Sequence, residues 1–374
     1  MIRKIADNII SPLGFCTETC YKAVRQGESQ LRLYEGKWQL PEPFVASLIN
    51  DEQLEEAYTH LNHAPLGVTR FEKMVLLSAE KAIAESGIDT SSERVVFILS
   101  TTKGNVSLLE HSDVDPETVS LGHSANVLTR YFHNPNTPIV VSNACISGVC
   151  AQIEAMRCLQ SGRYDYAVVV GADEQSKFIV SGFQSFKALS DEPCRPFSKS
   201  RNGLNLGEAA ATIILQRIDN AQGWCLINGA IRNDANHISG PSRTGEGYYR
   251  ALRSVMGGNA TNTLACINVH GTATAYNDEM EAIAIERAGL IDVPVVGLKG
   301  YFGHTMGAAG VLETILTMRS LDNSLLLATR GFDELGVSRP VKVQNQVAST
   351  NKKAFIKALS GFGGSNAVLL YNKV

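Results

Sequence analysis

Short, nearly continuous apolar runs recur along the chain and predict β-strands that are buried on both faces. These predicted strands are Val95–Leu99, Ile139–Ser142, Tyr166–Val170, Ala211–Leu215, Cys225–Ala230, Cys266–Val269, Val293–Leu298, Ala354–Leu359 and Val368–Tyr371. Between them, the segments 71–86, 149–159 and 311–321 repeat apolar residues three and four positions apart, which predicts helices with one buried face. Strands that alternate with helices indicate an α/β protein with parallel or mixed sheets.

The order of these elements repeats within the chain. A predicted strand, a turn and a helix cover residues 139–159, and the same succession returns at 295–321, where the turn is rich in glycine. We therefore predict two similar halves, residues 1–218 and 219–374. The polar stretch 233–247 is the most loop-like segment of the chain, and we expect it to cover the entrance of a site.

The composition of the 374 residues is that of an ordinary globular protein, with 44% hydrophobic and 19% charged residues. The net charge of −3 argues against a nucleic-acid-binding protein of the basic-patch type. None of the eight cysteines forms a Cys-x-x-Cys motif, no stretch reaches 18 apolar residues, and the N-terminus lacks the apolar core of a signal peptide. We therefore expect a reduced, cytoplasmic protein without a membrane span.

Cys145 is the first candidate for chemistry. It follows a predicted buried strand and directly precedes a predicted helix. Unpaired N–H groups at a helix N-terminus favour an anion, so this position would lower the pKa of the thiol and offer donors to an oxyanion. The alternative is a small core residue, since free cysteine is among the most buried residue types. Cys150 lies on the apolar stripe of the helix, and we predict it to be such a core residue.

His270 marks a second candidate segment. It ends a predicted strand and precedes the polar turn Gly271-Thr272. Asp278 and Glu281, three positions apart, share one face of the helix that follows. A structural histidine followed by acidic residues in a first helical turn is the alternative interpretation, because the helix dipole favours that placement anyway.

Lys299 and His304 mark a third segment, where another predicted strand ends. Close helix packing would explain the small residues Gly307–Gly310, but it would not explain a lysine and a histidine at this position. Ligands of α/β sheets gather at the carboxyl ends of strands. One cysteine and two histidines at strand ends therefore favour thiol-based acyl chemistry over a zinc site, which would need a short ligand pair that the chain lacks.

Over nearly its whole length, the chain resembles the β-ketoacyl-acyl carrier protein synthases, in particular their elongating Cys-His-His branch. The motifs that carry this resemblance occur in the family's order. They are Ile9–Gly14, Ala144–Gly148, Arg195–Phe197 with Asn202-Gly203 and Gly207–Ala209, His270–Thr272 with Asn277, Asp278 and Glu281, Lys299 with Gly303–Thr305, Gly307–Gly310 and Glu313, and Gly361–Ala367.

The resemblance implies a thiolase-like fold, in which two similar halves form α-β-α-β-α layers, and a decarboxylative condensation. Cys145 would carry the acyl group as a thioester, and the backbone N–H groups of Cys145 and Phe362 would hold the oxyanion. His270 and His304 would promote decarboxylation of malonyl-carrier protein. Phe362 would gate the acyl pocket, and Lys299 would belong to the catalytic set.

The resemblance also implies supporting residues and partners. Glu313 would act with Lys299 on the orientation and charge of the histidines, and Asp278, Glu281 and Thr272 would support His270. No cofactor or metal is implied. The partners would be acyl- and malonyl-loaded acyl carrier protein and a second subunit, in a homodimer or in a heterodimer with a related chain. Candidate carrier-protein contacts are Lys187, Lys199, Arg201 and Arg130.

Three positions depart from the family's pattern. Ile146 is bulkier than the usual residue after the nucleophile, Ser360 stands where an aromatic residue is common, and Ala273 replaces a glycine. We predict that Ile146 and Ser360 shape the acyl pocket, in fatty-acid or polyketide (for example polyene) synthesis. The alternatives are a non-catalytic chain-length subunit, which typically lacks the nucleophile, and a thiolase-fold acyltransferase that uses coenzyme A thioesters.

Overall fold

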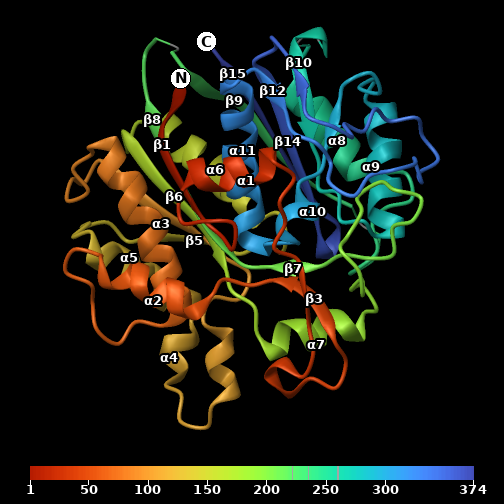
Figure 1. Ribbon diagram of the computed structural model, residues 1–374. Coiled ribbons are helices and arrows are strands. Elements are labelled where there is room, and N and C mark those ends of the chain that lie inside the picture. Colours follow the sequence, from red (N-terminus) through yellow and green to blue (C-terminus); the bar gives the residue numbers. More distant parts are fainter. Residues whose placement is uncertain (221, 235, 259–260) are drawn as a thin grey trace.

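The computed structural model describes residues 1–374 with the exception of 221, 235 and 259–260. A ten-stranded sheet runs through the molecule in the order β11-β10-β14-β15-β9-β1-β8-β6-β4-β5 (Figure 1). Its strands are β1 (Ile2–Ile10), β4 (Val95–Ser100), β5 (Ile139–Val141), β6 (Tyr166–Asp173), β8 (Ala209–Arg217), β9 (Trp224–Asn233), β10 (Leu264–Asn268), β11 (Val295–Val296), β14 (Ala354–Gly361) and β15 (Ser365–Lys373).

The sheet consists of two five-stranded halves with the same topology. The orders β1-β8-β6-β4-β5 and β9-β15-β14-β10-β11 match strand for strand. Within each half, two antiparallel strand pairs are followed by two parallel pairs. The halves join where Ile2 and Arg3 of β1 pair with Leu226 and Cys225 of β9. The predicted duplication is thus visible in the sheet, and the division at residue 218 stays a prediction.

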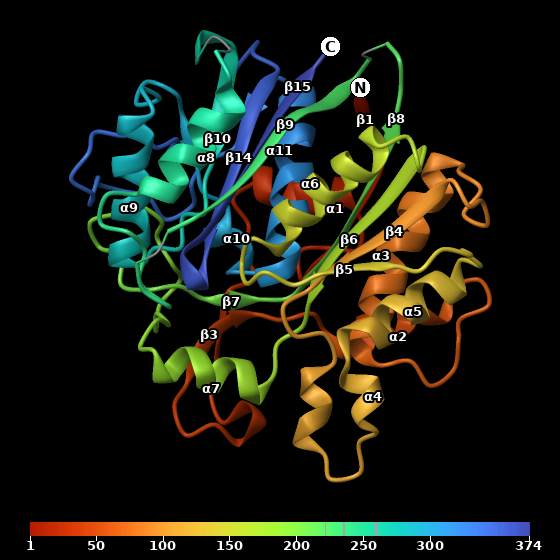
Figure 2. The ribbon, with the colours of Figure 1, turned by 180° about the vertical axis from the view of Figure 1, so that it is seen from behind.

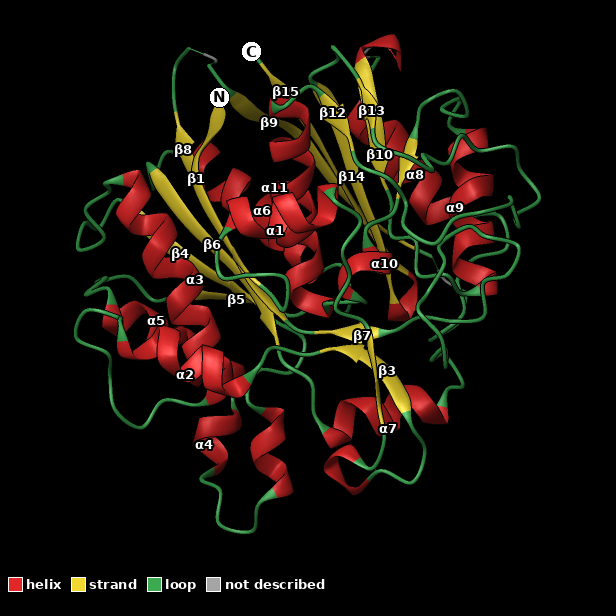
Figure 3. Ribbon diagram, viewed as in Figure 1, coloured by secondary structure: helices red, strands yellow, loops and turns green. Residues whose placement is uncertain are grey.

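Helices cover both faces of the sheet (Figure 3). The larger ones are α1 (Thr17–Arg25), α2 (Asp51–Thr59), α3 (Arg70–Ser86), α5 (Leu121–Tyr131), α6 (Ser147–Gln160), α7 (Lys177–Ser185), α8 (Glu246–Met256), α9 (Ala275–Arg287) and α11 (Ala309–Asp322). Shorter elements are α4 (Pro116–Val119), α10 (Lys299–Phe302), η1 (Lys37–Gln39), η2 (Val106–Glu110), η3 (Thr261–Thr263), η4 (Met306–Ala308), η5 (Phe362–Gly364) and the small strands β2 (Arg32–Tyr34), β3 (Phe44–Ser47), β7 (Leu206–Gly207), β12 (Leu325–Leu326) and β13 (Ala348–Ser349).

The helices and the two halves of the sheet form five layers (Figures 1 and 2), and three of the hydrophobic cores lie between these layers. The central core contains residues of α1, α6 and α11. A second core lies under α3 and α5, and a third lies under α8 and α9. Successive residues of one strand enter different cores, as Ile213 and Ile214 of β8 do. This arrangement confirms the predicted α-β-α-β-α layers.

All nine predicted strands and all three predicted helices are present, with ends displaced by up to three residues. Strand β1 was not predicted, because polar residues interrupt its apolar positions. Strand β5 is only partly buried, contrary to the prediction, because it lies at the sheet edge with β4 as its only sheet neighbour among the described strands. No helix among the described residues combines the length and hydropathy that a bilayer crossing requires.

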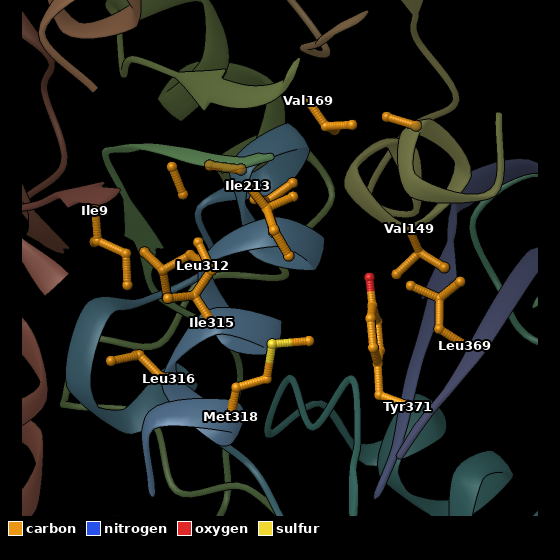
Figure 4. Packing of buried hydrophobic residues seen from close by; sticks show 14 of the residues in the cluster. Ile9, Val149, Val169, Ile213, Leu312, Ile315, Leu316, Met318, Leu369 and Tyr371 are labelled. Carbon is orange, nitrogen blue, oxygen red and sulfur yellow. The ribbon is translucent and has the colours of Figure 1, made fainter. Parts of the chain in front are cut away.

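Glycines let α6 and α11 pack closely at the centre of the molecule. A methyl group added at Gly310 would lie 2.5 Å from the Val149 backbone nitrogen, and one at Gly148 would lie 2.8 Å from the Gly307 carbonyl oxygen. Further along, the side chains of both helices fill the central core, where Val149 of α6 lies beside Leu369 of β15 (Figure 4). Close packing therefore does explain the small residues, and it also brings the starts of the two helices together.

Candidate active site

Cys145 lies in a tight turn between β5 and α6. Ala144 adopts φ of +45°, a left-handed conformation that is strained for a residue with a side chain. Ser147 holds the turn, because its hydroxyl accepts from the Asn143 N–H (2.8 Å) and donates to the Ala144 carbonyl (2.7 Å). The thiol is thereby fixed just before the first turn of a 14-residue helix.

Two backbone N–H groups face the sulfur. The N–H groups of Phe362 and of Cys145 itself lie close enough to the sulfur to lower the pKa of its thiol. Gly361 permits this approach, since a methyl group there would lie 3.2 Å from the Cys145 nitrogen. A carbonyl oxygen of a thioester formed on this sulfur would find two donors, which is the arrangement of an oxyanion hole.

The pKa of the Cys145 thiol differs from the sequence-based prediction. Burial raises it to about 11, although the Lys299 charge and the Phe362 N–H both lower it. The prediction of a lowered pKa is therefore wrong, because removal from water outweighs the favourable groups around the sulfur. The resting thiol is therefore neutral, and a reaction at its sulfur would need a proton acceptor nearby.

Two histidines lie next to the thiol. His270 follows β10, and His304 lies between α10 and η4, with their ring centroids 5.0 Å apart and their planes nearly perpendicular. Cys145 Sγ and one nitrogen of each ring lie within 4.8 Å of one another. Burial and the Lys299 charge hold the pKa of both imidazoles well below 6.5, so both rings are neutral.

Hydrogen bonding sets the tautomer of His304. Its Nδ1 accepts from the Met306 N–H at 3.2 Å, so the ring proton is on Nε2. Nε2 of His304 and Nδ1 of His270 are both buried without a hydrogen-bond partner among the described residues. Both rings line the same cavity. Unpaired polar atoms of this kind are ready to bind a substrate.

Lys299 and Glu313 form a buried ion pair behind the histidines, with Lys299 Nζ 2.9 Å from Glu313 Oε1. The other carboxylate oxygen of Glu313 lies 2.5 Å from Nζ of Lys357. Burial alone would raise the pKa of Glu313, but the two ammonium groups bring it below its ordinary value. Lys357 was not among the residues predicted from the sequence, where its signal is a single charge inside a strand predicted to be buried on both faces.

Glu281 supports the turn that carries His270. It accepts from the backbone N–H groups of His270 and Gly271, both at 2.7 Å, and from the Tyr248 hydroxyl, also at 2.7 Å. Asp278 instead accepts from the Phe197 N–H at 2.7 Å, and burial raises its pKa to about 7.

Thr272 was expected to support His270 from behind. Its hydroxyl pairs with that of Thr274 at 2.9 Å, and its side chain lines the cavity wall.

Two cavities meet at Cys145 and Phe362. The first, of about 550 Å³, is lined by both histidines, Thr272 and Ser360. The second, of about 680 Å³, is almost entirely apolar, and its wall includes Phe178, Ile179, Phe183 and Met306. The Phe362 ring stacks on Phe183 at a centroid distance of 5.9 Å and contacts Phe186 edge-on at 5.7 Å. It therefore stands between the cavities.

Ile146 does not take the predicted position in the acyl pocket. Its side chain is fully buried in the central core, it packs behind Gly361, and it lines neither cavity at Cys145. The physical reason is that the residue after the nucleophile caps α6, with its side chain on the core side of the turn. Ser360 does line the first cavity, where its hydroxyl donates to Asn366 at 2.8 Å. Ala273 is buried at φ of +62°, which a glycine would adopt without strain.

The four candidate carrier-protein contacts differ in availability. Lys187 is exposed at the mouth of the first cavity, and Arg130 is an exposed residue of α5. Lys199 pairs with Glu334 at 3.0 Å, and Arg201 donates to the carbonyls of Ser198 and Gly336. Lys187 is thus the candidate nearest to the site that is free to meet a partner.

A compact Cys-His-His group suits the acyl chemistry expected from the sequence and also the zinc site that the sequence disfavoured, and the paired N–H donors at the sulfur favour acyl chemistry. Residues 11–221 match the family model "Beta-ketoacyl synthase, N-terminal domain", and residues 225–333 match "Beta-ketoacyl synthase, C-terminal domain". The chain belongs to the β-ketoacyl synthase family.

Similar proteins span the whole chain. The 3-oxoacyl-[acyl-carrier-protein] synthase 2 of Vibrio harveyi is 27% identical over 98% of this chain and 97% of its own. A chain of the ketosynthase ApeO in complex with its chain length factor ApeC, from Xenorhabdus doucetiae, is 25% identical, with a TM-score of 0.84 and coverage of 100% and 98%. AntDE:AntF, a type II PKS acyl-carrier protein in complex with its ketosynthase bound to the hexaketide, shares the fold at 19% identity, with a TM-score of 0.85 and coverage of 100% and 99%.

Proposed function

We propose that this chain is a β-ketoacyl-acyl carrier protein synthase, which condenses malonyl-carrier protein with an acyl group held on Cys145. The observation that carries the proposal is the meeting of the Cys145 thiol, two neutral imidazoles and two backbone N–H donors between two cavities. Membership of the β-ketoacyl synthase family supports the same reaction.

The first step is acyl transfer to Cys145. The sulfur attacks the thioester carbonyl of the acyl-carrier protein, and the resulting oxyanion binds the N–H groups of Cys145 and Phe362. The thiol proton passes through a neutral imidazole to the departing carrier-protein sulfur. One thioester is broken and another is formed, so no co-reactant is needed.

The second step is condensation. The His304 Nε2–H and the His270 ring bind the thioester carbonyl of malonyl-carrier protein, which loses carbon dioxide and becomes an enolate. The enolate carbon attacks the acyl carbonyl on Cys145, and the oxyanion again occupies the N–H pair. Its collapse releases the β-ketoacyl product and the Cys145 thiolate, which takes a proton from solvent.

The remaining residues act through these groups. Lys299 contacts Glu313, so we assign it as a positioning residue whose charge keeps the imidazoles neutral. Glu281 holds the His270 turn, and Asp278 holds the neighbouring chain at Phe197.

Partners, location and domain limits also belong to the proposal. The partners are acyl carrier protein and a second subunit, identical or related, as the names of similar proteins suggest. Eight free cysteines, all of them described, agree with a reducing cytoplasm. The sheet topology supports halves at 1–218 and 219–374. Retention of Cys145 with its donors argues against a non-catalytic chain-length subunit, and His304 and Lys299 argue against the coenzyme A branch that uses Cys-His-Asn.

Intact-protein mass spectrometry with a panel of aliphatic and aryl acyl-carrier proteins tests the proposal. We expect an acyl adduct on the wild type, none on Cys145→Ser, and β-ketoacyl product once malonyl-carrier protein is added. Cys158→Ser is the control, because Cys158 is more exposed than Cys145 and lies outside both cavities. A wild type without an adduct, beside a synthase that forms one, would point to the non-catalytic subunit.

A further inference from the structure

A fully buried lysine lies behind the two histidines. Lys357 is in the middle of β14, a strand whose residues are buried except for the last one, and its own exposed fraction is 0%. A lysine is almost never buried without a partner, because an ammonium ion removed from water must be compensated by other groups. The groups around Nζ therefore indicate the role of the Lys357 ammonium group.

Five oxygen atoms surround Nζ of Lys357. They are Glu313 Oε2 at 2.5 Å, Asn268 Oδ1 at 2.6 Å, the Val269 carbonyl at 3.2 Å, and the carbonyls of Asn268 and Ala358, both at 3.5 Å. An ammonium group has only three N–H donors, so the oxygens also act together as a solvation shell for its charge. Thr317 completes the arrangement, because its hydroxyl accepts from Asn268 Nδ2 at 2.9 Å and so turns Oδ1 toward Lys357.

This oxygen shell is connected directly to the histidine site. Asn268 and Val269 are the two residues that precede His270 in the chain, so Lys357 holds the backbone that carries this ring. Glu313 shares its two carboxylate oxygens between Lys357 and Lys299. Two buried ammonium groups thus share one carboxylate behind the two imidazoles, and this cluster of three residues carries a net positive charge.

A net positive charge in a poorly hydrated site opposes a second positive charge nearby. Lys357 is one of the groups that lower the pKa of both histidines. Its effect follows burial and Lys299 at His304, and it follows burial, Lys299 and His304 at His270. Burial also lowers the pKa of Lys357, to about 8, against the attraction of Glu313. The other titratable groups that interact with Lys357 include Lys299, Glu281 and Cys266. Tyr248 adjoins this group, since its hydroxyl donates to Glu281.

We propose that Lys357 is a positioning residue of the condensation reaction, a built-in cation that fixes Glu313 and the His270 backbone and keeps both imidazoles neutral. The proposal rests on the proposed function, since it assigns the neutral rings their role in decarboxylation. The competing explanation is that Lys357 only balances the buried charge of Glu313. In that case substitution of Lys357 would lower the stability of the protein but would not change the pH dependence of the reaction.

The test compares Lys357→Met, which keeps the unbranched side chain up to the position of Cε but removes the ammonium group, with Lys373→Met. Lys373 lies on neighbouring β15 and pairs with Asp322 at the surface, so it is a matched control. For each variant the rate of malonyl-carrier protein decarboxylation is measured from pH 5 to 9, together with the extent of acyl transfer to Cys145.

We expect decarboxylation by Lys357→Met to fall about 10²-fold, while acyl transfer to Cys145 changes only a few-fold. Without the positive charge an imidazole gains a proton more readily, so the acid limb of the pH profile moves up by about one pH unit. Lys373→Met should match the wild type in both respects.

If Lys357→Met shows no cooperative unfolding and is therefore not folded, Lys357→Gln is used instead. Glutamine keeps hydrogen-bond donors for Asn268 and Val269. A folded variant with the wild-type rate and acid limb would overturn the proposal, and so would failure of both variants to fold, since Lys357 would then be a structural counter-ion. A wild type that does not decarboxylate malonyl-carrier protein would instead contradict the proposed function.

Discussion

Helices α6 and α11 occupy equivalent places in the two halves but supply different chemistry. Each has 14 residues, and each follows a turn with a residue at φ of +45°, Ala144 before α6 and Met306 before α11. The α6 turn presents the Cys145 thiol and backbone N–H groups. The α11 turn presents His304, and the carboxylate of Glu313 follows in the second turn of α11.

Different kinds of polar group surround the side chains that the two turns present. At α6, main-chain N–H groups from two segments face the sulfur. At α11, a carboxylate and two lysines form a buried charged cluster behind the imidazole. The comparison teaches that one duplicated scaffold can place a thiol and a pair of imidazoles face to face, because the glycines between the helices allow both helix starts to meet.

Removing the reactive side chain of either turn should have the largest effect on activity. Cys145→Ala should abolish acyl transfer and condensation while the histidines still decarboxylate malonyl-carrier protein. His304→Ala should lower decarboxylation about 10²–10⁴-fold, because a hydrogen-bond donor to the enolate is lost, and should leave much of the acyl transfer intact. Acyl-adduct mass and carbon dioxide release measure the two activities.

His111→Ala is the control for the histidine variant, because His111 is exposed and lines neither cavity. Equal loss of both activities in Cys145→Ala and His304→Ala would contradict the division of labour between the turns. Decarboxylation by His304→Ala at the wild-type rate would remove His304 from the mechanism.

The contact between the helices should respond strongly to a single methyl group. Gly310→Ala would place its Cβ 2.5 Å from the Val149 backbone nitrogen, so we expect a loss of about 1–3 kcal/mol in the free energy of unfolding. Gly182→Ala in α7 is the matched control, with no atom within 4 Å of the new Cβ, and should gain about 0.5–1 kcal/mol. Urea unfolding followed by circular dichroism measures both, and equal stability of the variants would show that the helices can move apart freely.

The smallest expected effect is on the pH dependence of the free energy of unfolding. In the folded protein the pKa of His304 lies well below 6.5, so below pH 6.5 the unfolded chain binds a proton that the folded chain does not. His304 therefore weakens folding as the pH falls, by about 1 kcal/mol at pH 5.5. His304→Gln should lose less stability than the wild type between pH 7.5 and 5.5.

Cys145→Ser should follow the wild type over this range, because burial raises the pKa of the thiol to about 11. Urea unfolding at the two pH values tests both variants. If His304→Gln and the wild type respond alike, then the pKa of His304 is not lowered in the folded protein.

Much of the fold followed from local pattern. The nine apolar runs are strands and the three periodic segments are helices, because buried strands and helix faces need apolar residues at fixed spacing. Strand β1 was missed because its polar residues break the run, and Ile146 was misplaced because spacing along the chain does not tell on which side of a turn a side chain lies.

The sequence by itself determined the α/β class, the family motifs and the identities of Cys145, His270, His304 and Glu313. Only the tertiary structure decided that these groups meet, that Phe362 divides two cavities, and that Lys357 completes the charged cluster. It also decided the charge states, in which the thiol keeps its proton and the imidazoles stay neutral. The reason is that loss of water and proximity of charges depend on which separate segments of the chain the fold brings together, and no local pattern records this.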